Sequence, residues 1–581
     1  MKNLFSIIGD RWWFRSFKDK LRQMRRPRPS VFEQKPWLAF YDQGVPPEIS
    51  LPAKTLCDLL QEAVDLHPER TALIYFGRKI SYARLNLLIE QFAQGLIEFG
   101  IRKGDCITLI LPNLPQFIIA YWAALRCGAL PVPMNPLCSV GEVQTMTRIC
   151  RPKMIIAFEP LCRKLNGALD EGGAQLVMAS IGTFMPPMTH LLYFFRNGMR
   201  RQSASVPMPA RSFSSFFRST THSLPSISPQ DQALLLFTGG VTGVPKAVLL
   251  HHHHLVANTL QTRVWLGADV GNPVIVGVLP LFHSYGMTAC HHLAIAGAAT
   301  LILEPRFKAA RVLDLMQKYH PTLFAGVPTM FRALLNFITE NNKRVRCSCI
   351  CVSGGAPLPL DLKHEFEQAT GARLIEGYGL TETSPITHCN PAVNRDRAGS
   401  IGLPFPNTEA RIVDPKGRPT AVGEIGELQV RGPQVMSGYF CNPAETQLVL
   451  SADGWFSTGD LARMDADGFF YIVDRKKDLI LYGGFNIYPS EVEEVLNEHP
   501  DIAESAVVGL PDSYYGEVVA AFIKLEDGAA VSPDRIVEFC RNKLAPYKVP
   551  KRIEFVDQLP KNFIGKIVRR KLLENFSNGS V

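Results

Sequence analysis

The 581-residue sequence predicts an α/β fold, in which a large N-terminal domain of doubly wound sheets with a small β-barrel-like part precedes a small α+β domain. Two observations carry this prediction. Helical patterns alternate with short apolar strands, as in the strand of residues 106–111, the helix of 116–126 and the strand of 129–133. Such alternation is typical of a parallel sheet covered by helices. The length also exceeds what one core accommodates.

Changes in composition predict the domain boundaries. We expect a basic amphipathic arm over residues 1–50 and a large domain over 51–474. A Ser-, Pro- and Met-rich segment at 172–230 interrupts the strand–helix alternation, and it is interpreted as an insertion loop or a membrane-contacting element. A short charged break then precedes the small domain, which occupies 478–581. The hinge at 475–477 is implied by the family resemblance described below.

The net charge of +9 is concentrated in two segments. Residues 1–36 hold ten Lys and Arg against three acidic residues, and residues 172–230 hold five Arg and no acid. The rest of the chain is close to neutral. This pattern favours a local anionic partner such as a membrane surface, and no RNA- or DNA-reading motif supports a nucleic-acid partner.

The arm contains a candidate interfacial helix at residues 13–24. Its apolar side chains fall on one side at helical spacing, and basic side chains fall on the other. An interfacial anchor needs this pattern, although a surface helix packed on the body or a frayed tail shares it. The apolar-basic run LLYFFRNGMRR begins at Leu191. We therefore expect peripheral contact with an anionic membrane through residues 1–36 and 190–220.

The sequence predicts a cytoplasmic protein that is peripherally associated with the membrane. No apolar run reaches the roughly 18 residues that a transmembrane helix needs. The short apolar stretch at residues 4–8 lacks a cleavage pattern, so no secretory signal is expected. The 13 cysteines show no disulfide spacing, and Cys347, Cys349 and Cys351 alternate as small hydrophobes on one strand face.

A Gly- and Thr-rich loop follows an apolar strand at residues 233–237 and reads FTGGVTGVPK. Its candidate phosphate-binding residues are Thr238, Gly239, Gly240, Thr242, Gly243 and Lys246. Glycines let the backbone approach phosphate oxygens, while Thr hydroxyls and a Lys add donors and charge. The loop is not a Walker P-loop, because Val and Pro separate its last Gly from the Lys.

The loop resembles the phosphate-binding loop of the adenylate-forming superfamily, which includes acyl-CoA synthetases, luciferases and the adenylation domains of peptide synthetases. Further segments resemble the superfamily's motifs in the same order, namely PLFHS (280–284), SGGAPL (353–358), GYGLTET (377–383), GWFSTGD (454–460), DRKKD (474–478) and PKNFIGK (560–566). The resemblance runs from about residue 55 to 573. The segment at 172–230 and the run DRKKDLILYGGFNIYPSEVE most resemble long-chain fatty acid–CoA ligases.

This resemblance implies an acid–thiol ligase that uses ATP to convert a fatty acid into an acyl-adenylate and then an acyl-CoA, releasing AMP and pyrophosphate. ATP and CoA are its co-substrates and Mg²⁺ its cofactor. In the first step a carboxylate anion must attack a phosphate group that is also negatively charged. The site must therefore neutralise charge and align the two groups.

The resemblance also implies roles for single residues. The remaining nucleotide-binding residues are Gly354, Gly355, Ala356, Glu376, Gly377, Tyr378, Gly379, Asp460 and Arg475. Of these, Gly355 and Tyr378 flank the adenine, and Asp460 accepts hydrogen bonds from the ribose. Thr381 contacts phosphate, and Glu382 holds Mg²⁺. The catalytic lysine, Lys566, bridges the attacking carboxylate and the leaving phosphate oxygens.

For the second step, the resemblance implies that the small domain rotates about Lys477 and brings Gly483 and Gly484 to the path of CoA. His283 lies near the acyl carboxylate as a third catalytic residue beside Lys566 and Thr381. The predicted acyl pocket consists of Phe282, Tyr285, Met287 and Val327. No charged side chain marks an amino-acid or aryl-acid pocket.

Two positions depart from the superfamily pattern. Val241 stands where Thr or Ser is usual, and Ala247 stands where Gly is usual. Losing one phosphate donor costs on the order of 1–2 kcal/mol of binding. Two alternative functions remain, namely a fatty-acyl-AMP ligase that loads an acyl carrier protein and a non-catalytic, membrane-associated protein that binds nucleotide or lipid. A homodimer is compatible with the sequence.

Overall fold

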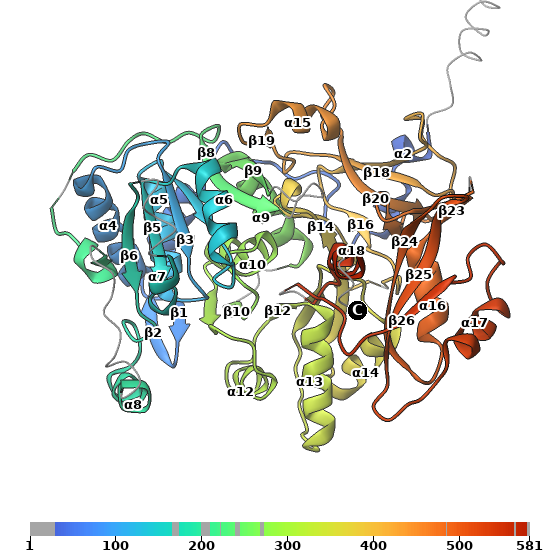
Figure 1. Ribbon diagram of the computed structural model, residues 1–581. Helices are drawn as coiled ribbons and strands as arrows, with labels where there is room; N and C mark the ends of the chain where they lie inside the picture. Colours follow the sequence, from blue (N-terminus) through green and yellow to red (C-terminus); the bar gives the residue numbers. More distant parts are fainter. Residues whose placement is uncertain are drawn as a thin grey trace, which may run out of the picture.

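We analysed a computed structural model of the chain, which describes residues 30–165, 173–198, 210–220, 222–238, 245–267, 272–394, 396–483, 485–562 and 565–577. A large body contains most of the chain, and the smaller C-terminal domain, in orange and red, lies against one side of it (Figure 1). This two-part α/β architecture confirms the predicted fold class.

A nine-stranded sheet forms the centre of the large domain. Its strands, in spatial order, are β16 (Leu403–Pro404), β15 (Ile386–Cys389), β14 (Arg373–Gly379), β13 (Ile350–Ser353), β12 (Leu323–Gly326), β10 (Val274–Gly277), β11 (Thr300–Leu303), β1 (Thr71–Tyr75) and β2 (Arg78–Ser81). The middle strands pair in parallel, as do Leu323 with Ile350 and Ile350 with Arg373. Their carboxyl ends therefore meet at one edge, where ligands of open α/β sheets bind.

A second parallel sheet occupies the N-terminal side of the large domain. Its order is β4 (Leu130–Pro133), β3 (Cys106–Ile110), β5 (Met154–Phe158), β6 (Gln175–Ala179) and β7 (Arg211–Ser212). A three-stranded antiparallel sheet, ordered β19 (Gly438–Tyr439), β9 (Lys246–His251) and β8 (Gln232–Thr238), carries the Gly- and Thr-rich loop between β8 and β9. The predicted strands at 106–111 and 129–133 are confirmed.

Helices cover the sheets of the large domain. They are α2 (Val31–Gln34), η1 (Pro36–Phe40), α3 (Leu56–Leu66), α4 (Tyr82–Phe99), α5 (Pro115–Arg126), α6 (Val140–Cys150), α7 (Glu159–Leu165), α8 (Pro187–Gly198), η3 (Phe213–Phe216), α9 (His252–Trp265), α10 (Ser284–Gly286), η4 (Met287–His292), α11 (Leu293–Ala296), α12 (Ala309–Tyr319), α13 (Pro328–Glu340), α14 (Leu360–Thr370), η5 (Thr381–Thr383) and α15 (Pro443–Val449). Every residue of α5 is buried, because this helix lies between other elements.

A four-stranded antiparallel sheet accounts for the predicted β-rich part. Its order is β17 (Glu409–Val413), β18 (Gly426–Arg431), β20 (Phe456–Met464) and β21 (Phe470–Arg475). Buried and partly exposed residues alternate along β18, as expected for a sheet with one buried face. Its last strand ends at Arg475, where the hinge was predicted.

The C-terminal domain has its own sheet and apolar core. Strands β23 (Phe485–Ile487), β22 (Ile480–Tyr482), β25 (Gly516–Leu525) and β24 (Ile502–Asp512) pair in that order, and β26 (Arg552–Phe555) pairs in parallel with β25. The helices are α16 (Pro489–Asn497), α17 (Pro533–Arg541) and α18 (Arg569–Ser577). Ile480, Val492 and Ile536 lie in a cluster that contains residues of this domain alone.

The structure divides two predicted segments differently. Part of the arm belongs to the body, because Trp37 is buried and its ring lies 6.0 Å from that of Phe470. The predicted helix at 13–24 lies outside the described residues. Within the predicted insertion, β6 pairs in parallel with β5, and Phe213 stacks on Phe92 of α4. The run QLVMA forms a core strand. This strand is hard to recognise in the sequence because its flanking residues are polar.

Lys566 reaches the large domain on a tight turn of the C-terminal domain. Asn562 accepts a hydrogen bond at its side-chain oxygen from the Lys566 N–H, at 2.9 Å. Gly565 has a φ of +82°, and a Cβ there would lie 2.8 Å from Cγ2 of Thr329, in the first turn of α13. A glycine at this position therefore permits close contact between the two domains.

Candidate active site

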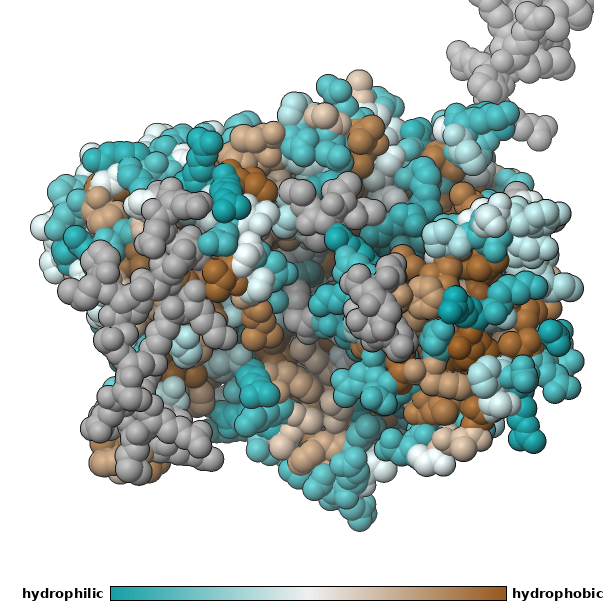
Figure 2. Space-filling view, in the orientation of Figure 1, coloured by the Kyte–Doolittle hydropathy of each residue, from teal (hydrophilic) through white to brown (hydrophobic). Residues whose placement is uncertain are grey.

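A cavity of about 1840 Å³ lies where the C-terminal domain meets the large domain. Figure 2 shows the surface hollowed between the two parts near the centre of the view. Sixteen residues named from the sequence line this cavity, namely Thr238, Lys246, Phe282, His283, Tyr285, Gly354, Gly355, Gly377, Tyr378, Gly379, Thr381, Glu382, Asp460, Arg475, Lys477 and Lys566. One space thus contains side chains from widely separated motifs.

Other predicted residues lie elsewhere. Five of them are not among the residues that line the cavity, namely Met287, Val327, Ala356, Glu376 and Gly483. Met287 and Val327 are buried in the apolar core of the large domain. Another five, Gly239, Gly240, Thr242, Gly243 and Gly484, fall outside the described residues, as does Val241.

The strongest polar cluster joins β14 to the β20–β21 hairpin. Tyr378 donates a hydrogen bond from its hydroxyl to Oδ2 of Asp460 at 2.6 Å, and Nε of Arg475 lies 3.3 Å from Oδ1. Asp460 and Arg475 are paired across the hairpin, which fixes their separation. The cluster provides a buried carboxylate acceptor with ordered neighbours, as recognition of a sugar hydroxyl needs.

Glycines bring backbone to the cavity at the ends of β13 and β14. A Cβ at Gly379 would lie 1.9 Å from the carbonyl oxygen of Pro385, so only glycine fits there. A Cβ at Gly354 would lie 3.1 Å from the ring of Tyr285, whose hydroxyl donates to the Val352 carbonyl at 2.8 Å. These positions leave a flat, backbone-lined surface beside Tyr378, which suits a planar base.

Glu382 lies on η5 with its side chain held from a neighbouring strand. The hydroxyl of Tyr439 donates to Oε1 of Glu382 at 3.0 Å, and the Met436 N–H donates to its carbonyl at 2.8 Å. Burial raises the pKa of Glu382, and the bond from Tyr439 opposes that shift. A partly buried carboxylate with spare oxygen capacity fits Mg²⁺, a hard cation that prefers oxygen ligands.

His283 begins the short helix α10. Its Nδ1 accepts a hydrogen bond from the Tyr285 N–H at 3.2 Å, and burial lowers its pKa to about 4. The imidazole is therefore neutral near pH 7, with the proton on Nε2. The hydroxyl of Ser284 lies 3.4 Å from that of Thr381, which brings the PLFHS and GYGLTET motifs into contact.

Two lysines of the terminal motif line the cavity, namely Lys561, which pairs with Glu504 at 2.6 Å, and Lys566. The pKa of Lys566 falls to about 8, because burial and the nearby Arg475 disfavour the ammonium while Asp460 opposes the shift. At pH 7 the side chain remains mostly charged. A desolvated ammonium interacts more strongly with anions than one exposed to water does.

An apolar wall of the cavity was missed by the sequence reasoning. Its residues are Thr262, Leu266, Ala289, Leu323, Ala325, Ile386, Cys389 and Phe405. They come from α9, η4, β12, β15 and the segment after β16, so no single run of sequence marks them. The small side chains of Ala289 and Ala325 could have indicated this wall in the sequence, because small residues in the same cavity as His283 leave room for an alkyl chain.

Glu376 is buried on β14 just before the GYGLTET motif. Burial raises its pKa to about 8, and a hydrogen bond from the Leu358 backbone opposes that shift. Its carbonyl accepts from the Asn390 N–H at 2.9 Å. In this structure Glu376 connects β14 to the loops around it.

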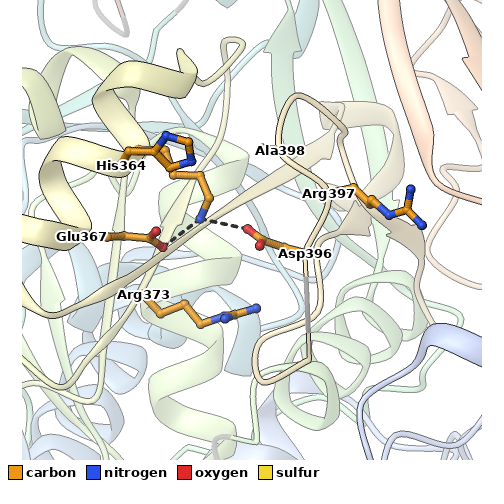
Figure 3. Close-up of a pocket in the computed structure, with 7 residues that line it drawn as sticks. His364, Glu367, Arg373, Asp396, Arg397 and Ala398 are labelled. Atoms are coloured by element: carbon orange, nitrogen blue, oxygen red, sulfur yellow. Dashed lines mark hydrogen bonds and ion pairs between the residues drawn. The ribbon is translucent and has the colours of Figure 1, made fainter.

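A second, polar pocket of about 510 Å³ lies beside α14 (Figure 3). Nζ of Lys363 lies 2.7 Å from Glu367 and 2.9 Å from Asp396, and it also donates to the Leu374 carbonyl at 2.6 Å. The guanidinium of Arg373 donates to the Pro391 carbonyl. The charges in this pocket are neutralised by their neighbours, so the pocket ties α14 to the following loop.

The three alternating cysteines are buried, as the sequence predicts, but of the three only Cys351 lies in a strand, because β13 begins at Ile350. Cys347, Cys349 and Cys351 are buried in an apolar cluster behind the nine-stranded sheet. Within the described ranges, no group of three or more His, Cys, Asp or Glu side chains is arranged to hold a metal ion. Likewise, none of the helices in those ranges is long and apolar enough to cross a membrane.

Family models match both parts of this architecture. The model described as AMP-binding enzyme matches residues 60–440, and the model described as AMP-binding enzyme C-terminal domain matches residues 491–566. The chain belongs to the AMP-binding enzyme family. Within it, a long-chain-fatty-acid–CoA ligase of Bacillus subtilis (strain 168) is 40% identical over 556 residues, which cover 93% of this chain and 98% of the relative.

Solved structures of AMP-binding enzymes have the same overall fold. ATP-bound MatB from Rhodopseudomonas palustris superposes with a TM-score of 0.78 at 28% identity, covering 90% of this chain and 100% of MatB. Apo MatB from the same organism covers 91% of this chain and 100% of its own, also at 28% identity, but its TM-score is 0.67. The chain thus resembles the nucleotide-bound form more closely.

Proposed function

We propose that this AMP-binding enzyme activates a long-chain fatty acid with ATP, forms an acyl-adenylate, and transfers the acyl group to CoA. The observation that carries this proposal is the shared cavity, which contains Lys246, Glu382, Asp460 and Lys566 together with an apolar wall. Acid–thiol ligation needs this combination of nucleotide, phosphate and alkyl recognition. The name of the Bacillus subtilis relative supports the same reaction.

The nucleotide would bind across the ends of β13 and β14. The adenine would lie on Gly355 beside the ring of Tyr378, and the ribose hydroxyls would donate to Asp460. Asp460 already receives a hydrogen bond from Tyr378 and an ion pair from Arg475, so its orientation is set before ATP arrives. This order reduces the entropy lost on binding.

In the first step an oxygen of the fatty acid carboxylate attacks the α-phosphorus of ATP. The bond from that phosphorus to the oxygen bridging the α- and β-phosphates breaks, and pyrophosphate leaves with the electron pair. Lys566 would neutralise both anions, Thr381 would donate to phosphate, and neutral His283 would face the acyl carboxyl. Mg²⁺ held by Glu382 would supply further neutralisation of the phosphate charge.

In the second step the CoA thiolate attacks the acyl carbonyl carbon and AMP leaves with the electron pair of the mixed anhydride bond. The family resemblance implies that the C-terminal domain turns about Lys477 between the steps. The better superposition on ATP-bound MatB supports assigning this structure to the first step. Gly483, whose φ is +54°, would then come towards the CoA path.

The acyl pocket supports an alkyl substrate. Leu266, Ala289 and Phe405 form part of the apolar wall, and Phe282 and Tyr285 border it. No carboxylate or ammonium of an amino-acid substrate would find a charged partner in this wall. Each buried methylene of a long chain contributes about 0.8 kcal/mol, so chain length favours binding.

Membrane contact would deliver such a substrate. On α8 four large apolar side chains at helical spacing are exposed, namely Met188, Leu191, Leu192 and Phe195. The helix protrudes at the lower left of Figures 1 and 2. Its residues overlap the predicted contact segment at 190–220, while the other segment, 1–36, lies mostly outside the described residues.

The proposal is tested by incubating the protein with ATP, Mg²⁺ and acetate, octanoate, palmitate, oleate or 4-coumarate, with and without CoA. AMP and acyl products are read by mass spectrometry. Palmitoyl- or oleoyl-CoA with stoichiometric AMP is the expected result. Acyl-AMP that accumulates without CoA consumption would favour the carrier-protein ligase, and absence of AMP with every acid would favour the non-catalytic alternative.

A further inference from the structure

One side chain lies between the loop lysine and the buried acid of η5. The hydroxyl of Tyr439 donates to Oε1 of Glu382 at 3.0 Å, and the ammonium of Lys246 lies 5.1 Å from the centroid of the same ring. Nζ of Lys246 is also 2.5 Å from Oε2 of Glu445. These four residues form a continuous network, of which Lys246, Glu382 and Tyr439 line the cavity.

We propose that Tyr439 is a positioning residue that orients the Glu382 carboxylate for a divalent cation and the Lys246 ammonium for phosphate, with Glu445 as the counter-ion that phosphate displaces. The inference rests on the proposed nucleotide site. It adds two residues, Tyr439 and Glu445, that lie outside the sequence motifs described above. Neither needs to touch the substrate in order to act.

The backbone holds Tyr439 firmly. Strand β19 pairs Tyr439 with Val248 of β9, close to Lys246, and the Phe440 N–H donates to the Ala247 carbonyl at 2.7 Å. The Tyr439 N–H donates to the hydroxyl of Thr446 on α15 at 2.9 Å. Because these hydrogen bonds hold β19 against both β9 and α15, the Tyr439 phenol returns to one position whenever the cavity opens.

Glu382 requires such a neighbour. Its side chain is partly buried and accepts from the Tyr439 hydroxyl, while the Met436 N–H donates to its backbone carbonyl. An ionised carboxylate has about four acceptor sites, so one hydrogen bond from a phenol leaves capacity for a hard cation. A phenol also adds no positive charge that would repel that cation.

Glu445 would act as a displaceable partner of Lys246. The side chains of the two residues are 19% and 30% exposed, so the pair is open to an incoming anion. Asn442 caps α15 by accepting from the Glu445 N–H at 3.2 Å, which fixes the backbone that carries the acid. A nucleotide whose phosphate binds Lys246 must break the ion pair between Lys246 and Glu445. The free energy needed to break this pair lowers the apparent affinity of the protein for the nucleotide.

Equilibrium binding of ATP without fatty acid tests the network. Calorimetric titrations with ATP in excess Mg²⁺ and with ATP in EDTA are made on the full chain, on Tyr439→Phe and on Glu445→Gln. Tyr471→Phe is the matched control, because Tyr471 donates to Asp465 at 3.0 Å in the same domain but does not line the cavity. Circular dichroism and melting curves establish that each variant folds.

Tyr439→Phe is expected to reduce the gain in affinity that Mg²⁺ provides by about five- to tenfold, with EDTA affinity unchanged within about twofold. Glu445→Gln is expected to raise ATP affinity in EDTA at least twofold, since ATP then binds Lys246 without breaking an ion pair. Equal losses with and without Mg²⁺, no loss in Tyr439→Phe, or no Mg²⁺ gain in the unmodified chain would each overturn the proposal. A wrong acyl substrate class would leave these results unchanged.

Discussion

The hydroxyl of Tyr378 lies 2.6 Å from Oδ2 of Asp460, although the two residues are 82 positions apart in the chain. This bond connects the central sheet to the four-stranded antiparallel sheet beside the proposed nucleotide site. A neutral phenol that donates to an ionised carboxylate forms a charge-assisted hydrogen bond, which is stronger than one between neutral groups. The burial of Tyr378 beside Asp460 also raises the pKa of Tyr378 well above its usual value, so the hydroxyl keeps its proton.

Tyr378→Phe is expected to raise KM for ATP by about fivefold and to change kcat by less than about twofold, because it removes a bond that orients Asp460 without touching the phosphates. Initial rates of AMP release at saturating fatty acid and CoA measure both constants. A fall in kcat with KM unchanged would instead assign Tyr378 to the chemical step.

Lys566→Ala is expected to lower adenylate formation from free acid by at least about 100-fold, while CoA transfer from preformed acyl-AMP stays within about threefold. The half-reactions are measured separately in rapid-quench experiments. Lys551→Ala is the control, because Lys551 is exposed in the same domain and does not line the cavity. Equal loss in both half-reactions would contradict the two-step assignment.

The adenylation rate is expected to fall as pH rises through about 8. The pKa of Lys566 is lowered to about 8, so its ammonium is present below that pH and is lost above it. Lys566→Arg keeps its charge to much higher pH, so the residual activity of this variant would lack the alkaline decline. The neutral His283, whose pKa is about 4, adds no inflection between pH 5.5 and 7.5.

Arg569→Ala is expected to destabilise the C-terminal domain by about 3 kcal/mol. Nη2 of Arg569 lies 2.7 Å from Glu493, whose side chain is 16% exposed, and removing the guanidinium leaves that carboxylate without its ion-pair partner. Arg570→Ala is the matched control, since Arg570 pairs at the surface with Glu574 and its loss costs less than about 1 kcal/mol. Urea unfolding followed by fluorescence compares the two, and similar losses would refute the expectation.

Replacing Leu191, Leu192 and Phe195 together by Ser is expected to lower binding to vesicles that contain phosphatidylglycerol by about tenfold or more, because their exposed apolar faces would enter the interface. Leu66→Ser is the control, since Leu66 is exposed elsewhere. Vesicle sedimentation measures the binding, and deletion of residues 1–29 separates the contribution of the arm. Unchanged binding in the triple variant would exclude α8 as a contact.

Local patterns predicted the strand at residues 106–111 well, because the apolar run CITLIL contains its own signal within a few residues. The apolar run before the Gly- and Thr-rich loop likewise forms β8, whereas residues 239–244 of that loop lie outside the described residues. The strand Gln175–Ala179 was missed because polar flanks reduced the contrast. Trp37 was assigned to the basic arm because its partner Phe470 lies more than 400 positions away.

Residues that act through long-range contacts escaped the sequence reasoning. The residues around Tyr439 in the sequence give no sign that it contacts Glu382, because this contact depends on the pairing of β19 with β9. The apolar wall is similarly assembled from segments that include Thr262 and Phe405. Sequence motifs identify groups that take part in chemistry directly, whereas the packing around those groups is visible only once the sheets are assembled.

The close approach of Gly565 to Thr329 has a consequence for timing. Since a Cβ at Gly565 would lie 2.8 Å from Thr329, a single added methyl group would act as a wedge between the docked domains, and only while they are docked. Such a wedge would penalise the state that makes the adenylate and spare the state that consumes it. The relative rates of the two half-reactions would therefore depend on the presence or absence of one atom, a Cβ at position 565, which lies far from any reacting bond.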